Sequence, residues 1–172
     1  MTDPHPVDPL WPRYSDRPFP SYRFVPGKSR HPQHNPHGHS YSQEEPTPRL
    51  LPPDQWAQSA DYLYGIDLYN YAYWWECHEV FEGLWKAAGH HGEQGNFFRA
   101  IIQLAAANLK LFMGSRQAAH NLLQRGVIRL QRVPESYMGV DVTGLTEDLQ
   151  QRVVGTTLYA PRIRLNGLEP VE

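Results

Sequence analysis

The sequence predicts an all-α protein, an up-and-down bundle of about five helices preceded by an extended, proline-rich N-terminal arm. Apolar residues recur at helical spacing from about residue 55 onward, and no alternating strand pattern competes with them. All prolines except Pro134, Pro161 and Pro170 lie within the first 53 residues. The connections between the periodic segments are short, which favours antiparallel neighbours. We expect the arm over residues 1–53, the bundle over 54–156 and an extended tail over 157–172.

The arm cannot form regular helix, because each proline lacks an N–H donor and disfavours helix at the residue before it. It nevertheless carries six aromatic residues, which disordered tails usually lack. They are Trp11, Tyr14, Phe19, Tyr22, Phe24 and Tyr41. We therefore expect much of the arm to be an extended segment packed on the bundle.

Five helical segments follow, separated by breaks at Gly65 and at three polar, glycine-containing stretches. Asp54 is the expected N-cap of the first. The third is apolar nearly all the way round, as expected of a central helix covered by its neighbours. The segments span about residues 54–63, 66–88, 93–113, 115–132 and 143–154.

Length and composition exclude several classes of protein. A chain of 172 residues has the length of a single domain. A net charge of -2 does not favour nucleic-acid binding, and Cys77, the single cysteine, fits a reducing compartment. The longest apolar run is too short and too interrupted to span a bilayer. We expect a cytoplasmic protein that binds neither nucleic acid nor membrane.

A cluster of ionisable residues lies among large aromatics in "YWWECHEVFEGLW", residues 73–85. His78 is followed by Glu79 and Glu82 and preceded by Glu76. The spacing resembles the H-E-x-x-H zinc helix, but Glu82 occupies the position of the second histidine. This difference weakens the interpretation as a zinc site, although His78 and Glu82 can both still act as metal ligands.

On one continuous helix, the residues at intervals of three and four form an aromatic stripe with polar insertions. Its members are Asp67, Tyr71, Trp74, His78, Glu82 and Trp85. Because aromatic residues bury large areas, we expect this stripe to face the bundle and to carry His78 and Glu82 inward. Glu76 should be the more exposed carboxylate. Gln103, Asn108 and His120 are the polar residues of the later helices that can reach the same interior.

Two interpretations of this cluster remain open. His78, Glu82 and Gln103 can form a satisfied structural network that fixes helix register. Alternatively, His78 and Glu82 supply one N and one O ligand to zinc, iron or manganese. A third ligand would then come from His120, or from His39 in the histidine-rich stretch "RHPQHNPHGHSY" of the arm.

The stretches "YWWECHEVFEGLW", "FFRAIIQLAAANLK" and "GSRQAAHNLL" together resemble the bacterial and archaeal domain of unknown function family 309. The hallmark of that family is a His-Glu-x-x-Glu-x-x-Trp helix followed by an apolar helix that contains glutamine. The resemblance covers about residues 62–133 and implies an all-helical bundle. The motif positions it carries over are His78, Glu79, Glu82, Trp85 and Gln103. It implies no reaction.

Two functions are therefore compatible with the sequence. The first is a binding module for a small ligand or a protein, in which the arm acts as a lid or crosses to a second subunit of a homodimer. The second is a metal-dependent hydrolase, with His78, Glu82 and His39 as ligands and Glu79 as the general base that activates a bound water.

Overall fold

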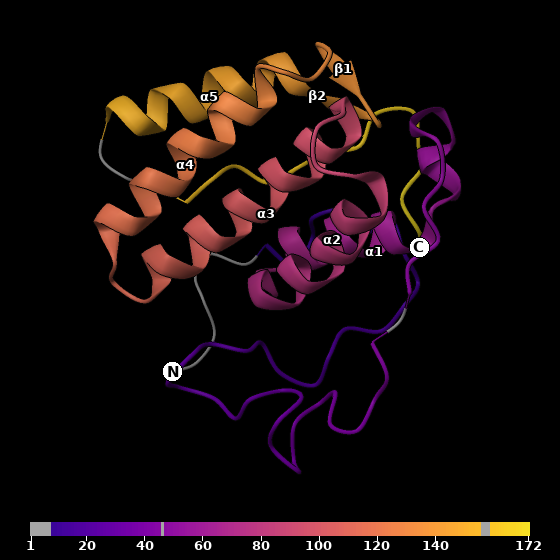
Figure 1. Cartoon of the computed structure of the whole chain (residues 1–172), viewed down its shortest axis with the longest axis vertical. Helices are drawn as coiled ribbons and strands as arrows, with labels where there is room; N and C mark the ends of the chain where they lie inside the picture. Colours follow the sequence, from indigo (N-terminus) through magenta and orange to yellow (C-terminus); the bar gives the residue numbers. More distant parts are fainter. Residues whose placement is uncertain (1–7, 46, 156–158) are drawn as a thin grey trace.

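The structure, a computed structural model, describes residues 8–45, 47–155 and 159–172, and it is mostly helical (Figure 1). The expected end of the bundle at residue 156 and the start of the tail at 157 lie outside these ranges. The elements in chain order are η1 (Pro53–Gln58), α1 (Ala60–Asn70), α2 (Trp74–Ala88), α3 (Glu93–Phe112), α4 (Arg116–Leu130), β1 (Ser136–Tyr137), β2 (Val140–Asp141) and α5 (Val142–Val154).

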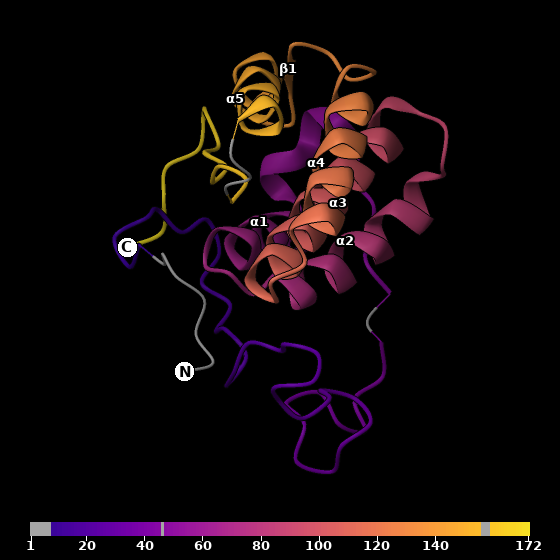
Figure 2. The ribbon, with the colours of Figure 1, turned by 90° about the vertical axis from the view of Figure 1, so that its left-hand side faces the viewer.

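Helix α3 lies at the centre of the bundle, between α2 and α4 (Figure 2). It buries residues on all sides, including Phe97, Phe98, Ile101 and Leu104. Helix α1 packs on α2, and α5 packs on α4. The all-α fold class and the central position of the third predicted helix are confirmed.

The predicted helix over 66–88 is wrong, because the chain forms two helices there. Helix α1 ends at Asn70, and Ala72 adopts a left-handed conformation with φ of 65°. The N–H of Tyr73 donates to the carbonyl of Leu68 over 2.9 Å, and the N–H of Ala72 donates to that of Tyr69 over 3.2 Å. These two bonds form a Schellman motif, which usually places glycine where this chain has alanine.

Gly65 does not end a helix, contrary to the sequence-based prediction, but lies buried inside α1. A Cβ atom at this position would lie 2.6 Å from Cε2 of Phe81 in α2. The glycine therefore permits the close approach of α1 and α2.

A short antiparallel hairpin of β1 and β2 precedes α5 and was not predicted. Ser136 pairs with Asp141, and Tyr137 pairs with Val140. Gly139 in its turn has φ of 80°, a conformation that glycine adopts without strain. Asp141 then caps α5, since its side chain accepts the N–H of Gly144 over 3.0 Å.

Buried polar side chains of the bundle hold both extended ends of the chain. Asp67 accepts the backbone N–H groups of Tyr14 and Ser15, each over 2.9 Å. Asn70 accepts the N–H of Ile163 over 2.7 Å and donates to its carbonyl over 2.8 Å. The arm and the tail therefore satisfy polar groups that the helices alone would leave unpaired.

Across the ranges that the structure describes, none of the helices combines the length and the apolarity needed to cross a membrane.

Candidate functional site

The candidate site is a cluster of three side chains on α2: His78, Glu79 and Glu82. Each offers one potential ligand atom, and these atoms lie within 4.8 Å of one another. Nδ1 of His78 lies 3.3 Å from Oε1 of Glu79 and 3.7 Å from Oε2 of Glu82. Glu82 meets His78 because residues four apart lie one above the other on adjacent turns of a helix. Glu79 directly follows His78 in the chain, and its side chain reaches the imidazole from the same turn.

The cluster lies at the surface, so the expected inward position of His78 and Glu82 is wrong. About a third of each side chain is exposed, 33% for His78 and 31% for Glu82. The buried face of α2 carries Trp74, Cys77, Phe81 and Leu84 instead. Trp74, the first member of the predicted stripe on α2, is buried, whereas His78 and Glu82 are only partly buried at the edge of this face.

Glu82 also contacts a cation, since Nζ of Lys86 lies 3.1 Å from its Oε1. This is an i,i+4 pair whose lysine is well exposed, and such pairs contribute only a few tenths of a kcal/mol. Lys86 therefore offsets part of the negative charge of the cluster without closing it to solvent.

Gln103 and Trp85, the two other motif positions, make no hydrogen bond to the cluster within the described residues. Gln103 on α3 is 7% exposed. Neither its Oε1 nor the indole N–H of Trp85 has a hydrogen-bond partner within the described residues. The Trp85 ring stacks on His90 with a centroid distance of 4.1 Å, and the guanidinium of Arg99 lies 4.7 Å from its centroid. The predicted network joining His78, Glu82 and Gln103 is absent from the described part of the chain.

His39 is not part of the cluster, because it binds Glu76. Its Nε2 lies 2.8 Å from Oε1 of Glu76, and both side chains are only 6% exposed. The same carboxylate oxygen accepts the N–H of Phe24 over 2.9 Å. The prediction that Glu76 is the more exposed carboxylate is therefore wrong, because the arm covers it.

Ser40 extends this contact into a chain of three polar side chains. Its Oγ lies 2.7 Å from Nδ1 of His39, in the order nucleophile, base and carboxylate that acyl-transfer enzymes use. Acyl transfer also needs N–H donors aimed at a developing oxyanion. The backbone N–H groups of His39, Ser40 and Tyr41 already donate to Tyr22 Oη, Pro32 O and Gly38 O. We therefore assign this chain of contacts to fastening the arm.

The histidine-rich stretch folds into a tight loop rather than crossing the cluster. Nδ1 of His31 accepts the N–H groups of Gln33 and His34 over 3.2 and 3.3 Å. A Cβ atom on Gly38 would lie 2.1 Å from the carbonyl oxygen of Pro32, so this close approach requires glycine. His120 on α4, the other predicted third ligand, is not among the residues that gather around His78.

Burial raises the pKa of two ionisable groups close to the core, Cys77 and Asp67. It raises the pKa of the Cys77 thiol well above its usual value, and the carboxylate of Glu76 acts in the same direction. Cys77 is fully buried and is therefore an inert thiol. Burial also raises the pKa of Asp67, while the N–H groups of Tyr14 and Ser15 oppose that effect.

Sequence reasoning missed the pairing of Glu76 with His39 and the role of Ser40. The "GHSY" stretch contained a signal, since a serine follows the histidine that the arm brings to the bundle. Nothing local identifies Glu76 as its partner, because 37 residues separate the two side chains.

Together, the fold and the site define a helical-bundle protein with a partly exposed His/Glu cluster on its second α-helix. The model of the family described as Domain of unknown function (DUF309) matches residues 62–122, which supports the resemblance to that family. The match spans α1, α2, α3 and the first part of α4, and it includes all three residues of the cluster. No curated protein is significantly similar to the chain.

Proposed function

We propose that this protein is a binding module that holds a divalent cation at His78, Glu79 and Glu82. The observation that carries the proposal is the meeting of three ligand atoms within 4.8 Å on one face of α2. One imidazole nitrogen and two carboxylate oxygens suit zinc, manganese or iron. Because the side chains are partly exposed, further coordination positions would face solvent, where a small oxygen-containing ligand can bind.

The position of Glu79 supports binding in preference to hydrolysis. In the sequence-based alternative, Glu79 acts as a general base on a water bound to the cation and is not itself a ligand of the cation. Its Oε1 lies 3.3 Å from Nδ1 of His78, close enough to share an ion with it. Glu79 thus takes the role of third ligand that was predicted for His39, whose two ring nitrogens contact Ser40 and Glu76.

The experiment is metal titration of protein purified without a histidine tag, followed by calorimetry and thermal unfolding with zinc and with manganese. We expect saturable binding of one ion that weakens at least tenfold in His78→Ala and in Glu82→Gln. At a free concentration of 100 times Kd, the ion should stabilise the parent by about 2.7 kcal/mol. Unchanged affinity in His78→Ala, or no saturable binding by the parent, contradicts the proposal.

Matched controls separate the cluster from general charge effects. His120→Ala and Glu147→Gln remove the same groups from α4 and α5 and should leave the affinity unchanged. Glu79→Gln distinguishes the two candidate functions. Loss of metal affinity supports a ligand role, whereas retained affinity with loss of a hydrolytic activity would favour the hydrolase. The homodimer remains a separate prediction, which light scattering of the full chain tests.

A further inference from the structure

A second feature lies on the arm, where two segments enclose an open hollow of about 550 Å³. One segment covers residues 21–23 and the other residues 28–30, and His37 closes the rim. The side chains that give the hollow its charge are those of Arg23, Lys28 and Arg30.

The hollow is cationic. Its lining, as far as the structure describes the chain, includes three basic side chains and no carboxylate. Ser21, Tyr22 and Ser29 also line it. A concave surface with charges of one sign focuses its field and attracts ions of the opposite sign.

Arg23 has a defined orientation, which distinguishes it from a mobile surface cation. Its Nε donates to the carbonyl of Tyr71 over 2.8 Å. Its guanidinium also lies 4.4 Å from the ring centroid of Tyr73. Arg23 is only partly exposed, so its charge is screened less by solvent than that of a free surface side chain.

The two exposed cations are placed by a turn. Gly27 has φ of 76°, and the N–H groups of Lys28 and Ser29 donate to the carbonyl of Val25 over 3.0 and 3.1 Å. Nζ of Lys28 lies 4.9 Å from the ring centroid of Phe112, and the guanidinium of Arg30 lies 5.8 Å from that of Tyr22. Each of the two cations thus lies against an aromatic ring, and Nη1 of Arg30 also donates to the carbonyl of His37 over 3.5 Å.

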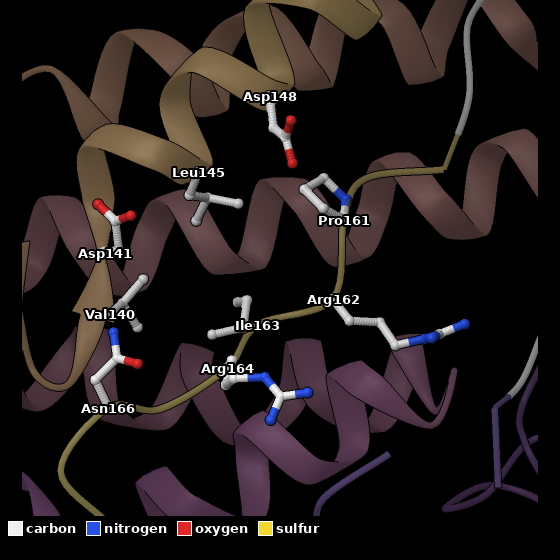
Figure 3. A pocket seen from close by; sticks show the side chains of 9 residues that line it. All are labelled: Val140, Asp141, Leu145, Asp148, Pro161, Arg162, Ile163, Arg164 and Asn166. Atoms are coloured by element: carbon white, nitrogen blue, oxygen red, sulfur yellow. The ribbon is translucent and has the colours of Figure 1, made fainter. Parts of the chain in front are cut away.

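A hollow beside α5 provides the contrast (Figure 3). It is smaller, about 250 Å³, and its lining includes two aspartates, Asp141 and Asp148, and two arginines, Arg162 and Arg164. Its charges balance, so it does not select for one sign of ligand. The arm hollow, in contrast, is lined by basic side chains without a carboxylate among the described residues, so it favours anions.

We propose that the arm hollow binds a small dianion, either inorganic phosphate or a phosphate monoester. Arginine and lysine are the side chains that proteins use for phosphate, since arginine donates two parallel N–H bonds and lysine supplies a point charge. The volume lies within the usual range for small-molecule sites. This site is separate from the cation cluster on α2 and shares no residue with it.

The test is calorimetric titration of the full chain with inorganic phosphate and with phenyl phosphate at low ionic strength. We expect saturable 1:1 binding that weakens at least tenfold in Lys28→Met/Arg30→Gln and falls with added sodium chloride. Tighter binding of phenyl phosphate identifies a monoester as the ligand class, and tighter binding of phosphate identifies the free ion. Both substituted side chains are exposed, and a thermal melt verifies that the variant remains folded.

The matched control is Lys110→Met/Arg125→Gln, which removes the same charges from exposed positions of α3 and α4. Its affinity should equal that of the parent. Equal weakening in the two double variants would reduce the effect to general charge attraction and overturn the proposal. So would the absence of saturable binding of either anion by the parent.

Discussion

At the scale of single residues, the spacing between α1 and α2 depends on Gly65. In the sequence this glycine is a helix-breaking signal, yet it lies in the interior of α1. The aromatic ring of Phe81 occupies the volume that any larger side chain would need. Phe81 is itself fully buried among Tyr62 and Phe98, so it cannot move without disturbing other rings.

Gly65→Ala should therefore destabilise the protein, although alanine is the better helix former by about 1 kcal/mol. Overpacking typically costs about 1–3 kcal/mol, so after the gain in helix propensity we expect a net loss of up to about 2 kcal/mol in chemical denaturation. In a Phe81→Leu background the smaller side chain leaves room for the new methyl group, and the same substitution should cost less. Additive losses in the double variant would show that Phe81 is not the cause.

At the scale of elements, buried carboxylates fasten the arm to α1 and α2. Asp67 holds the backbone at Tyr14, and Glu76 holds the backbone at Phe24 and the imidazole of His39. A buried carboxylate costs several kcal/mol unless hydrogen bonds satisfy it. The arm and the helices therefore depend on each other for stability.

A double-mutant cycle on His39→Ala and Glu76→Ala measures this dependence. We expect a coupling energy of about 1.5–3 kcal/mol, the range for hydrogen bonds to charged groups, from urea denaturation. The control is the pair Arg17–Asp61, which also joins the arm to α1, with 43% and 27% of the two side chains exposed. Its coupling should be below about 1 kcal/mol. Equal couplings would mean that burial of the His39–Glu76 pair has no energetic consequence.

At the scale of the whole molecule, the two ends of the chain meet over the helices. The N–H of Leu165 donates to Tyr14 Oη over 3.0 Å, and the N–H of Val171 donates to the carbonyl of Arg13 over 2.8 Å. Two asparagines of the bundle also bind the tail. Asn70 accepts the N–H of Ile163, and Asn108 accepts the N–H of Ala160. The tail is thus part of the folded unit, although it contains no helix within its described residues.

Asn70→Ala should release the tail, because it leaves the N–H and the carbonyl of Ile163 without their partner. Each unsatisfied group costs about 1–3 kcal/mol. Trypsin cleavage after Arg162 and Arg164 tracks the population of the open form, so we expect the cleavage rate to rise at least tenfold. Asn121→Ala, at an exposed position of α4, is the control. No change in cleavage would mean that other contacts suffice to hold the tail.

The sequence by itself determined the fold class and the later helices. The ends of α3, α4 and α5 were predicted to within two residues, because polar, glycine-containing stretches separate these helices in the sequence. The prolines excluded helix from the arm, and its aromatics indicated that it packs on the bundle. Such properties follow from neighbouring residues and need no knowledge of distant ones.

Only the tertiary structure decided where α1 ends and which of the carboxylates of α2, Glu76, Glu79 and Glu82, is buried. Ala72 is not a residue that normally marks a left-handed helix end, so local sequence did not reveal the break. Within α2, Trp74 of the predicted stripe is buried, while about a third of each of the His78 and Glu82 side chains is exposed. Oε1 of Glu76 accepts the N–H of Phe24 and contacts the imidazole of His39, residues that lie 52 and 37 positions away in the chain. Its Oε2 has no hydrogen-bond partner among the described residues. Burial of a polar group depends on partners that only folding brings together.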